Sequence, residues 1–270
     1  MLAAAPASAQ GACTRAELQA ATDSYVAAQT SGDPQRIQVA SPVRYTEQMV
    51  PADLQRGFLK KAEKIDFHRS LLDPGTCQSF TEAVVTNPAH PHVLGTRLKV
   101  ADGKVSEIET LLSDKDDWLF NPGNTMKYSQ AENWSVIPPA DRSSRATIIA
   151  AADAYLDYFN DKSVKVPWGS PCARLEGGIY TTRNAPGVVT PQDSCDVGVP
   201  SNTPLINRRY LVDEELGTVV VLLDFGKNQQ PDSHMFRVEN GKIRYVHTIT
   251  VCKTPNCGFP VKPIPDAPTQ

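Results

Sequence analysis

The chain has 270 residues, of which 40% are hydrophobic and 21% are charged, and its formal net charge is −3. Such a composition is typical of globular proteins, and the length suits two domains of roughly 100–150 residues each. The near-neutral charge argues against the dense basic patch that nucleic acids need, and no apolar run approaches the roughly 20 residues that cross a bilayer, so neither nucleic acid nor a membrane is an expected partner.

The N-terminal segment, residues 1–12, is rich in alanine and contains Ala7-Ser8-Ala9, which resembles a signal-peptidase site. It lacks a basic start and a full apolar stretch, so it is either the remnant of a signal peptide or a disordered leader. The six cysteines include no C-x-x-C pair, which favours disulfides in an oxidising compartment over zinc or redox chemistry. We therefore expect a secreted or periplasmic protein.

The spacing of the cysteines suggests how they pair, although six cysteines allow many pairings. One bond would attach the opening helix to the first sheet, and the two others would close loops in the second half of the chain. The expected pairs are Cys13–Cys77, Cys172–Cys195 and Cys252–Cys257.

An internal repeat organises the chain. Residues 15–28 are predicted to form an amphipathic helix, and the same pattern returns at residues 145–159. Three further matches follow in the same order: Arg44 with Arg174, residues 67–73 with 207–213, and the Gly-Lys hairpin after Asp102 with the one after Asn240. Asp-Gly and Asn-Gly turns are the strongest short-range signal for paired antiparallel strands. Matches in one order indicate an internal duplication.

Each copy is predicted to form a helix followed by a curved antiparallel sheet, an α+β layout in which the helix covers one sheet face. The predicted strands are at residues 44–49, 67–72, 79–86, 92–101 and 104–112, and again at 172–181, 208–212, 218–225, 234–239 and 242–252. We divide the chain into a first module at residues 13–113, an interdomain connection at 114–142, a second module at 143–253 and a proline-rich tail at 254–270, which we expect to run along the surface.

Several stretches carry a family resemblance: CTRAELQAATDSYVAAQTSGDP, KIDFHRSLLD, VPWGSPCARLEGGIYT, NRRYLVDEE and FRVENGKIRYVHTITVC. They are similar to a family of uncharacterised secreted fungal proteins, over nearly all of the chain from Cys13 to about Gly258. The helix, the strand order and the closing pair of long strands resemble the NTF2-like (SnoaL-like) cone-shaped α+β fold, here as a tandem duplication.

That resemblance implies a deep, mostly apolar pocket between helix and sheet. Enzymes of the fold include isomerases, dehydratases, cyclases and aldol-type lyases, usually without a metal or an organic cofactor, whereas other members only bind ligands or oligomerise. Folds of this kind frequently pair through their sheets, so the resemblance implies either a homodimer or an internal pairing of the two copies. Fold alone is a weak guide to activity.

A pocket enzyme without a cofactor needs a general base or acid, and histidine is the natural candidate. In the last strand Ile243, Tyr245, His247, Ile249 and Val251 are predicted to alternate onto one face. A tyrosine and a histidine on an apolar face are typical of a polar group that enters an apolar cavity. We therefore predict His247 as a base and Tyr245 as a donor to developing charge, the alternative being a core histidine satisfied by a backbone carbonyl.

His68 stands beside Arg69, and the second copy has Arg208 beside Arg209. Adjacent residues of a strand point to opposite faces. Either His68 and Arg208 face inward, as a second candidate base and as a ligand for an anionic or phenolic group, or Arg69 and Arg209 face inward and pair with acidic residues across the sheet.

The remaining candidates each have two interpretations. Glu82 lies among apolar residues and is either a base whose pKa is raised by desolvation or the ion-pair partner of Arg69 or Arg97. Tyr45, which shares a strand face with Glu47, has a similar ambiguity, and Trp168, which clusters with Arg174, either walls the pocket or holds a loop. The predicted substrate-binding residues are Tyr45, Arg69, Glu82, Trp168, Arg174 and Arg208. No spacing typical of metal ligands occurs in the sequence, so no metal ligands are predicted. A metal site would require four side chains to converge from distant positions: His68, His234, Glu82 and Asp73.

The sequence thus predicts a secreted lyase or isomerase without a cofactor, acting on a small hydrophobic molecule of aromatic, polyketide-like or terpenoid-like character. Proton abstraction by His247 or His68 would be followed by elimination, isomerisation or retro-aldol cleavage. The rival interpretation is a protein that binds a small molecule, or a partner, without catalysis.

Overall fold

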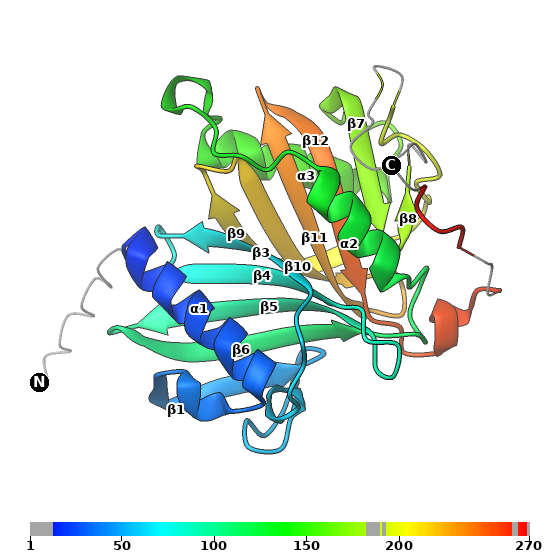
Figure 1. The fold of residues 1–270 in the computed structure, drawn as a ribbon. Helices are drawn as coiled ribbons and strands as arrows, with labels where there is room; N and C mark the ends of the chain where they lie inside the picture. Colours follow the sequence, from blue (N-terminus) through cyan, green and yellow to red (C-terminus); the bar gives the residue numbers. More distant parts are fainter. Residues whose placement is uncertain (1–12, 182–189, 191–192, 261–263, 269–270) are drawn as a thin grey trace, which may run out of the picture.

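The computed structural model describes residues 13–181, 190, 193–260 and 264–268, and over these residues the chain folds into two six-stranded sheets and three α-helices (Figure 1). The predicted α+β class and the two repeated sheet modules are therefore confirmed. The sheets are mixed and not antiparallel as predicted, because β1 (Val39–Glu47) runs parallel to β6 (Lys104–Ser113) and β7 (Trp168–Glu176) runs parallel to β12 (Lys242–Thr250). The predicted leader, residues 1–12, lies outside the described residues.

The first sheet has the strand order β2-β1-β6-β5-β4-β3. Its strands are β1 (Val39–Glu47), β2 (Val50–Pro51), β3 (Phe67–Asp73), β4 (Gln78–Val85), β5 (His92–Ala101) and β6 (Lys104–Ser113). Helix α1 (Arg15–Ser31) begins at a capping box formed by Thr14 and Glu17 and packs Leu18 and Tyr25 onto the sheet. Figure 1 shows α1 lying diagonally across one face of this sheet.

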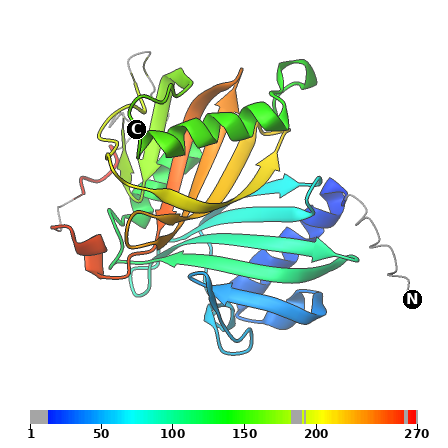
Figure 2. The ribbon, with the colours of Figure 1, turned by 180° about the vertical axis from the view of Figure 1, so that it is seen from behind.

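The second sheet repeats the order as β8-β7-β12-β11-β10-β9. Its strands are β7 (Trp168–Glu176), β8 (Ile179–Tyr180), β9 (Leu205–Asp213), β10 (Thr218–Phe225), β11 (Gln230–Glu239) and β12 (Lys242–Thr250). Helix α3 (Arg145–Tyr158), capped by Ser144, covers this sheet with Ile148 and Tyr155. Seen from behind, α3 crosses the front of the second sheet while α1 lies behind the first (Figure 2).

Strand register corrects one match of the repeat. Tyr45 is the β1 residue opposite Ile108, and Arg174 is the β7 residue opposite Val246, the corresponding position of the second hairpin. Arg174 is therefore equivalent to Tyr45 and not to Arg44. Register is fixed by pairing with the neighbouring strand, and residue identity alone missed it by one position.

The two sheets pack face to face, and helices α1 and α3 cover their outer faces. The apolar cluster between the sheets takes equal parts from both: Leu71, Phe80, Val84, Val93 and Leu111 from the first, and Leu211, Val220, Leu222, Met235 and Ile249 from the second. The internal pairing of the two copies, one of the two arrangements implied by the resemblance, is thus what the chain adopts.

Ion pairs cross this junction reciprocally. Arg15, at the start of α1, binds Asp213 of the second module at 2.8 Å, and Arg145, at the start of α3, binds Asp73 of the first module at 2.7 Å. Asp213 also accepts the backbone N–H of Leu72, and Asp73 that of Val212, each at 2.9 Å. These are duplicated positions, so the two modules are related by a pseudo-two-fold axis.

The connection between the modules contains a helix that the sequence analysis did not predict. Helix α2 (Pro122–Ala131) is capped by Asn121 and has Pro122 in its first turn. Its side chains are mostly polar, so no apolar period revealed it, although the cap and the proline are helix-start signals. The helix lies beside β4 and β8, where the two sheets diverge (Figure 1).

All three expected disulfides are present: Cys13–Cys77, Cys172–Cys195 and Cys252–Cys257. They fit a protein of an oxidising, extracellular environment. Within the described residues no helix is long and apolar enough to cross a membrane. The tail was expected to run along the surface, but Ala267 is buried and donates its N–H to the side chain of Asn124 at 2.6 Å.

Candidate functional site

Four of the predicted site residues meet at the junction of the modules. Arg69 on β3 and Glu82 on β4 come from the first module, and Tyr245 and His247 on β12 come from the second. Ile243, the first residue of β12 predicted to lie on the same face as Tyr245 and His247, lies on the opposite face. A bulge at Arg244 shifts the register, so Ile243 packs beneath α3 while the following alternate residues face the first sheet.

His247 lies between two buried carboxylates. Its Nδ1 is 3.1 Å from both carboxylate oxygens of Glu82, and its Nε2 is 2.6 Å from Glu132, the C-cap residue of α2. Burial alone would lower the pKa of His247, but the charges of Glu132 and Glu82 outweigh it and raise the pKa to about 9. At neutral pH both ring nitrogens therefore donate, and neither has a lone pair to accept a proton from a ligand.

Aromatic rings and an arginine close this cluster. The guanidinium of Arg69 lies 4.3 Å from the centre of the Trp134 ring and donates to the carbonyl of Ser129 at 2.6 Å. The ring of Tyr245 stacks on Trp134, and its hydroxyl accepts the N–H of Asn133 at 3.4 Å. The charges of the two glutamates, the arginine and the imidazolium balance, as buried charges must.

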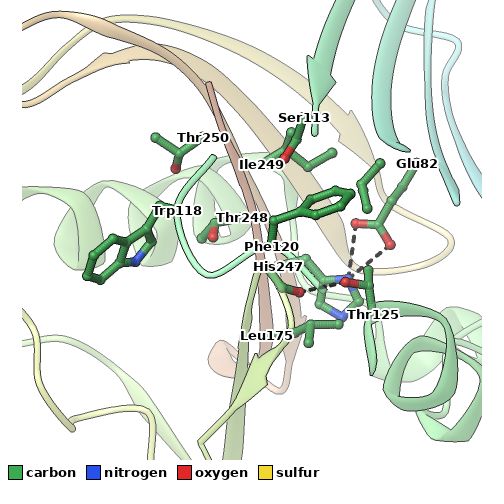
Figure 3. A pocket seen from close by; sticks show the side chains of 12 residues that line it. Glu82, Ser113, Trp118, Phe120, Thr125, Leu175, His247, Thr248, Ile249 and Thr250 are labelled. Atoms are coloured by element: carbon green, nitrogen blue, oxygen red, sulfur yellow. Dashed lines mark hydrogen bonds and ion pairs between the residues drawn. The ribbon is translucent and has the colours of Figure 1, made fainter. Parts of the chain in front are cut away.

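The space beside His247 is too small for a substrate. Figure 3 shows Glu82 and His247 on one side of it and Trp118, Thr248 and Thr250 on the other. Its volume is about 20 Å³, room for roughly one water molecule. The cluster joins first module, connection and second module, and it is better suited to holding them together than to turnover.

The other predicted site residues do not join this cluster. His68 is exposed. Arg69 and Arg209 are on the strand faces that meet the other module, where the partly exposed Arg209 binds Glu109 at 2.6 Å. Arg208 pairs with Asp153 and Asp157 of α3 at 2.9 and 2.7 Å.

Three candidates lie on the helix-covered faces. Tyr45 is buried and donates to Glu47 inside the first module. At the equivalent place in the second module, Nε of Arg174 lies 3.1 Å from Glu176. Trp168 packs edge-on against Tyr155 of α3, with ring centres 5.6 Å apart, as part of the core.

A larger cavity lies on the α3-covered side of the second sheet, beyond the C-terminal end of the helix at Phe159. Its volume is about 130 Å³, close to the roughly 150 Å³ of an engineered protein cavity that binds benzene. Most of the lining is aromatic, small or hydroxyl-bearing: Trp118, Phe159, Gly198, Pro200, Phe225, Thr248, Thr250, Cys257 and Phe259, together with Glu176, Gln230 and His234.

A histidine–aspartate pair stands in the wall of this cavity. His234 and Asp232 are alternate residues of β11, so both point toward α3, and Nδ1 of His234 lies 2.6 Å from Asp232. Asp232 is fully buried and also accepts the hydroxyl hydrogen of Thr250. Among the described residues Nε2 of His234 has no hydrogen-bond partner. In the neutral tautomer that donates Nδ1–H to the aspartate, Nε2 carries the lone pair and is the atom available to a ligand.

This pair was not among the predicted site residues. The predicted strand starts at residue 234, which leaves Asp232 outside, and His234 was considered only as a metal ligand together with His68, Glu82 and Asp73. These four side chains do not converge, and in the described part of the chain no group of three or more His, Cys, Asp or Glu side chains is arranged to hold a metal ion. An Asp-x-His pattern within a strand, which places both side chains on one face, was the available signal.

Fold and site together define a duplicated α+β protein with a cavity in its second module. The family model that matches is described as a domain of unknown function (DUF8021) and covers residues 141–250. That span holds α3 and the whole second sheet, and so the His234–Asp232 pair. No curated protein matches the chain.

Proposed function

We propose that this protein is an exported lyase or isomerase, independent of a cofactor, that acts on a small hydrophobic molecule in the cavity of the second module. His234 is the general base, and Asp232 orients its ring. The observation that carries the proposal is one buried histidine–aspartate pair whose free nitrogen lines a mostly apolar cavity.

The surroundings suit proton abstraction from carbon. Asp232 holds the imidazole in one tautomer and stabilises the imidazolium that forms when Nε2 takes a proton. The apolar walls exclude water from the reacting atoms, which strengthens electrostatic interactions within the cavity. The hydroxyl of Thr248 and the amide of Gln230 line the same space and can donate to an oxygen that gains negative charge.

Two further properties accompany the proposal. The three disulfides support secretion or export to the periplasm. The sheet faces through which such folds pair already cover each other in this chain, which supports a single chain as the working unit, without a homodimer formed through those faces.

A generic base substrate tests the chemistry. 5-Nitrobenzisoxazole is flat, uncharged and small; a base removes its ring C–H proton, the N–O bond breaks, and a nitrile and a phenolate form. We expect the wild type to accelerate this elimination above the rate in buffer, and His234→Ala to lower kcat/KM by about 100-fold or more. Asp232→Asn, which removes the charge that holds the ring, should lower it less.

His68→Ala is the matched control, because it removes an exposed histidine on the other module and should leave the rate unchanged. Equal loss in both histidine variants, or no loss in His234→Ala, contradicts the assignment of the base. If the wild type binds the probe without accelerating the reaction, the enzyme proposal falls and the non-catalytic binding protein takes its place.

A further inference from the structure

The mouth of the cavity is built by segments outside the two sheets. Trp118 belongs to the connection between the modules, and Phe259 belongs to the tail that follows β12. Both side chains line the cavity, and their ring centres lie 4.7 Å apart. Phe259 is nonetheless 58% exposed, which is unusual for a large aromatic side chain. Its outer face meets solvent and its inner side meets the cavity.

A small covalent loop fixes Phe259 in this place. The Cys252–Cys257 disulfide closes the chain just before it, and Phe259 donates its N–H to the carbonyl of Asn256 at 2.9 Å. Asn256 in turn donates to the carbonyl of Asp116, and Cys252 to the carboxylate of Asp117, each at 2.6 Å. The loop that carries Phe259 is thus tied to the segment that carries Trp118.

The disulfide has a local role. A bond between residues only five apart in sequence restricts the unfolded chain much less than the Cys13–Cys77 bond, which spans 64 residues. What it restricts is the folded loop, in which Asn256 and Cys257 adopt the left-handed conformation with φ of 51° and 54°. Non-glycine residues seldom adopt it without a constraint.

The charges around the cavity favour an uncharged ligand. Among the described lining residues none is a lysine or an arginine, and the carboxylate of Glu176 is turned to Arg174. Asp232 lies directly behind His234. An anion entering this space would lie near the carboxylates of Glu176 and Asp232 and would find no lysine or arginine among the described lining residues, which is costly in an apolar cavity.

We infer that Trp118 and Phe259 determine what the cavity admits, and that its ligand is an uncharged, flat aromatic molecule. This rests on the proposed function, since it concerns the same cavity. Four aromatic side chains, Trp118, Phe159, Phe225 and Phe259, surround the space and offer edges and faces to a planar ring. The loop closed by the Cys252–Cys257 disulfide holds Phe259 in its place in that wall.

Matched small probes test the inference: phenol, which is flat; cyclohexanol, which has the same heavy atoms but is puckered; and benzoate, which is flat and charged. Dissociation constants are measured by amide NMR titration of the oxidised protein. For the wild type we expect phenol to bind roughly tenfold more tightly than cyclohexanol and benzoate to bind weakly or not at all.

The variants Phe259→Ala and Trp118→Ala should reduce the phenol-to-cyclohexanol preference to about twofold or less. The double variant Cys252→Ser/Cys257→Ser should reduce it similarly, because Phe259 is then no longer held. Val50→Ala, an exposed position on β2, and Cys13→Ser/Cys77→Ser, a disulfide of the other module, are the controls and should keep the preference.

Each outcome decides a different point. If the wild type binds phenol and cyclohexanol equally, or if the preference survives in both Phe259→Ala and Trp118→Ala, the inference is overturned while the cavity of the proposed function stands. Tight binding of benzoate overturns the charge argument. If neither phenol nor cyclohexanol binds, the cavity is not a ligand site, and the proposed function falls with the inference.

Discussion

The two modules share one fold but differ in what lies between helix and sheet. The strand registers make Leu94, Thr96 and Leu112 of the first module the equivalents of Asp232, His234 and Thr250 of the second. In the first module Thr96 shares a 2.6 Å hydrogen bond with Tyr25 of α1 and a 3.0 Å bond with Thr110. In the second module Tyr155 stands where Tyr25 does, and His234 faces a cavity.

The first module is filled by a turn of its own. The 3₁₀ turn Phe58–Lys60 inserts Phe58 against Leu94, and Gln29 at the end of α1 donates to the carbonyl of Lys61 at 2.9 Å. The corresponding helix end in the second module is Phe159, which lines the cavity. The comparison indicates that one copy serves as a scaffold and the other holds the site, although nothing in the fold itself distinguishes them.

The largest expected effect comes from copying the first module into the second. The triple variant Asp232→Leu/His234→Thr/Thr250→Leu replaces the polar set with its equivalents. We expect it to lower turnover of 5-nitrobenzisoxazole by about 100-fold or more, while the free energy of unfolding stays unchanged or rises by up to about 2 kcal/mol, because a buried charge is removed. Kinetics and urea unfolding measure the two quantities.

The reverse set in the first module, Leu94→Asp/Thr96→His/Leu112→Thr, is its counterpart. It should destabilise the fold by about 3 kcal/mol or more, since Phe58 leaves no room for the new polar groups, and it should confer no activity. A triple variant in the second module that keeps full activity would show that the difference between the modules has no functional meaning.

Stability at alkaline pH tests a second difference between the two modules. His247 occupies the position of Glu109, so the junction has a cation on one side of the pseudo-two-fold axis and an anion on the other. Because the folded pKa of His247, about 9, lies above its unfolded value, its contribution is complete below the unfolded pKa and is lost as the pH rises through about 9. The loss should reach roughly 3 kcal/mol.

Urea unfolding at a series of pH values measures this loss, and His247→Gln should abolish the pH-dependent part while lowering stability at neutral pH. The charged and titratable groups around His247 are Glu82, Glu132, Arg69, Tyr180 and Tyr245. A wild-type stability that does not change between pH 7 and 10 would contradict the imidazolium assignment.

The smallest expected effect tests the symmetry itself. Asp73→Ala and Asp213→Ala each remove the acceptor of one backbone N–H and one arginine from the other module. Each should cost about 2–3 kcal/mol of unfolding free energy, and the two costs should agree closely. Asp116→Ala, at an exposed carboxylate, should change stability by less than about 0.5 kcal/mol. Clearly unequal costs would mean that the two modules do not depend on each other symmetrically.

Much of the fold was predictable from the repeat. The strands β5 and β10 and the disulfides match the predictions, because hairpin turns, alternation and cysteine spacing are local signals. Helix α2 was missed because its fold depends on contacts with β4 and β8, which no local period records.

The candidate site was harder to predict from the sequence than the fold. The sequence indicated His247, Tyr245, Arg69 and Glu82 as candidate site residues, and the structure brings them together. Only the coordinates show that Nε2 of His247 is bound by Glu132. His234 is a candidate base because it lines a cavity, and this cavity is formed in part by Phe159, Trp118 and Phe259, three residues far apart in the chain. Empty space between distant elements leaves no trace in a single sequence.

The exchange of Arg15 and Arg145 across the junction is what two identical one-module chains would make around a true two-fold axis. Joining the two genes would have kept each half beside its mate at any concentration. Each half could then change independently, with one hollow closing around Phe58 while the other stayed open, a division of labour that is not available to a symmetric pair in which every substitution appears twice.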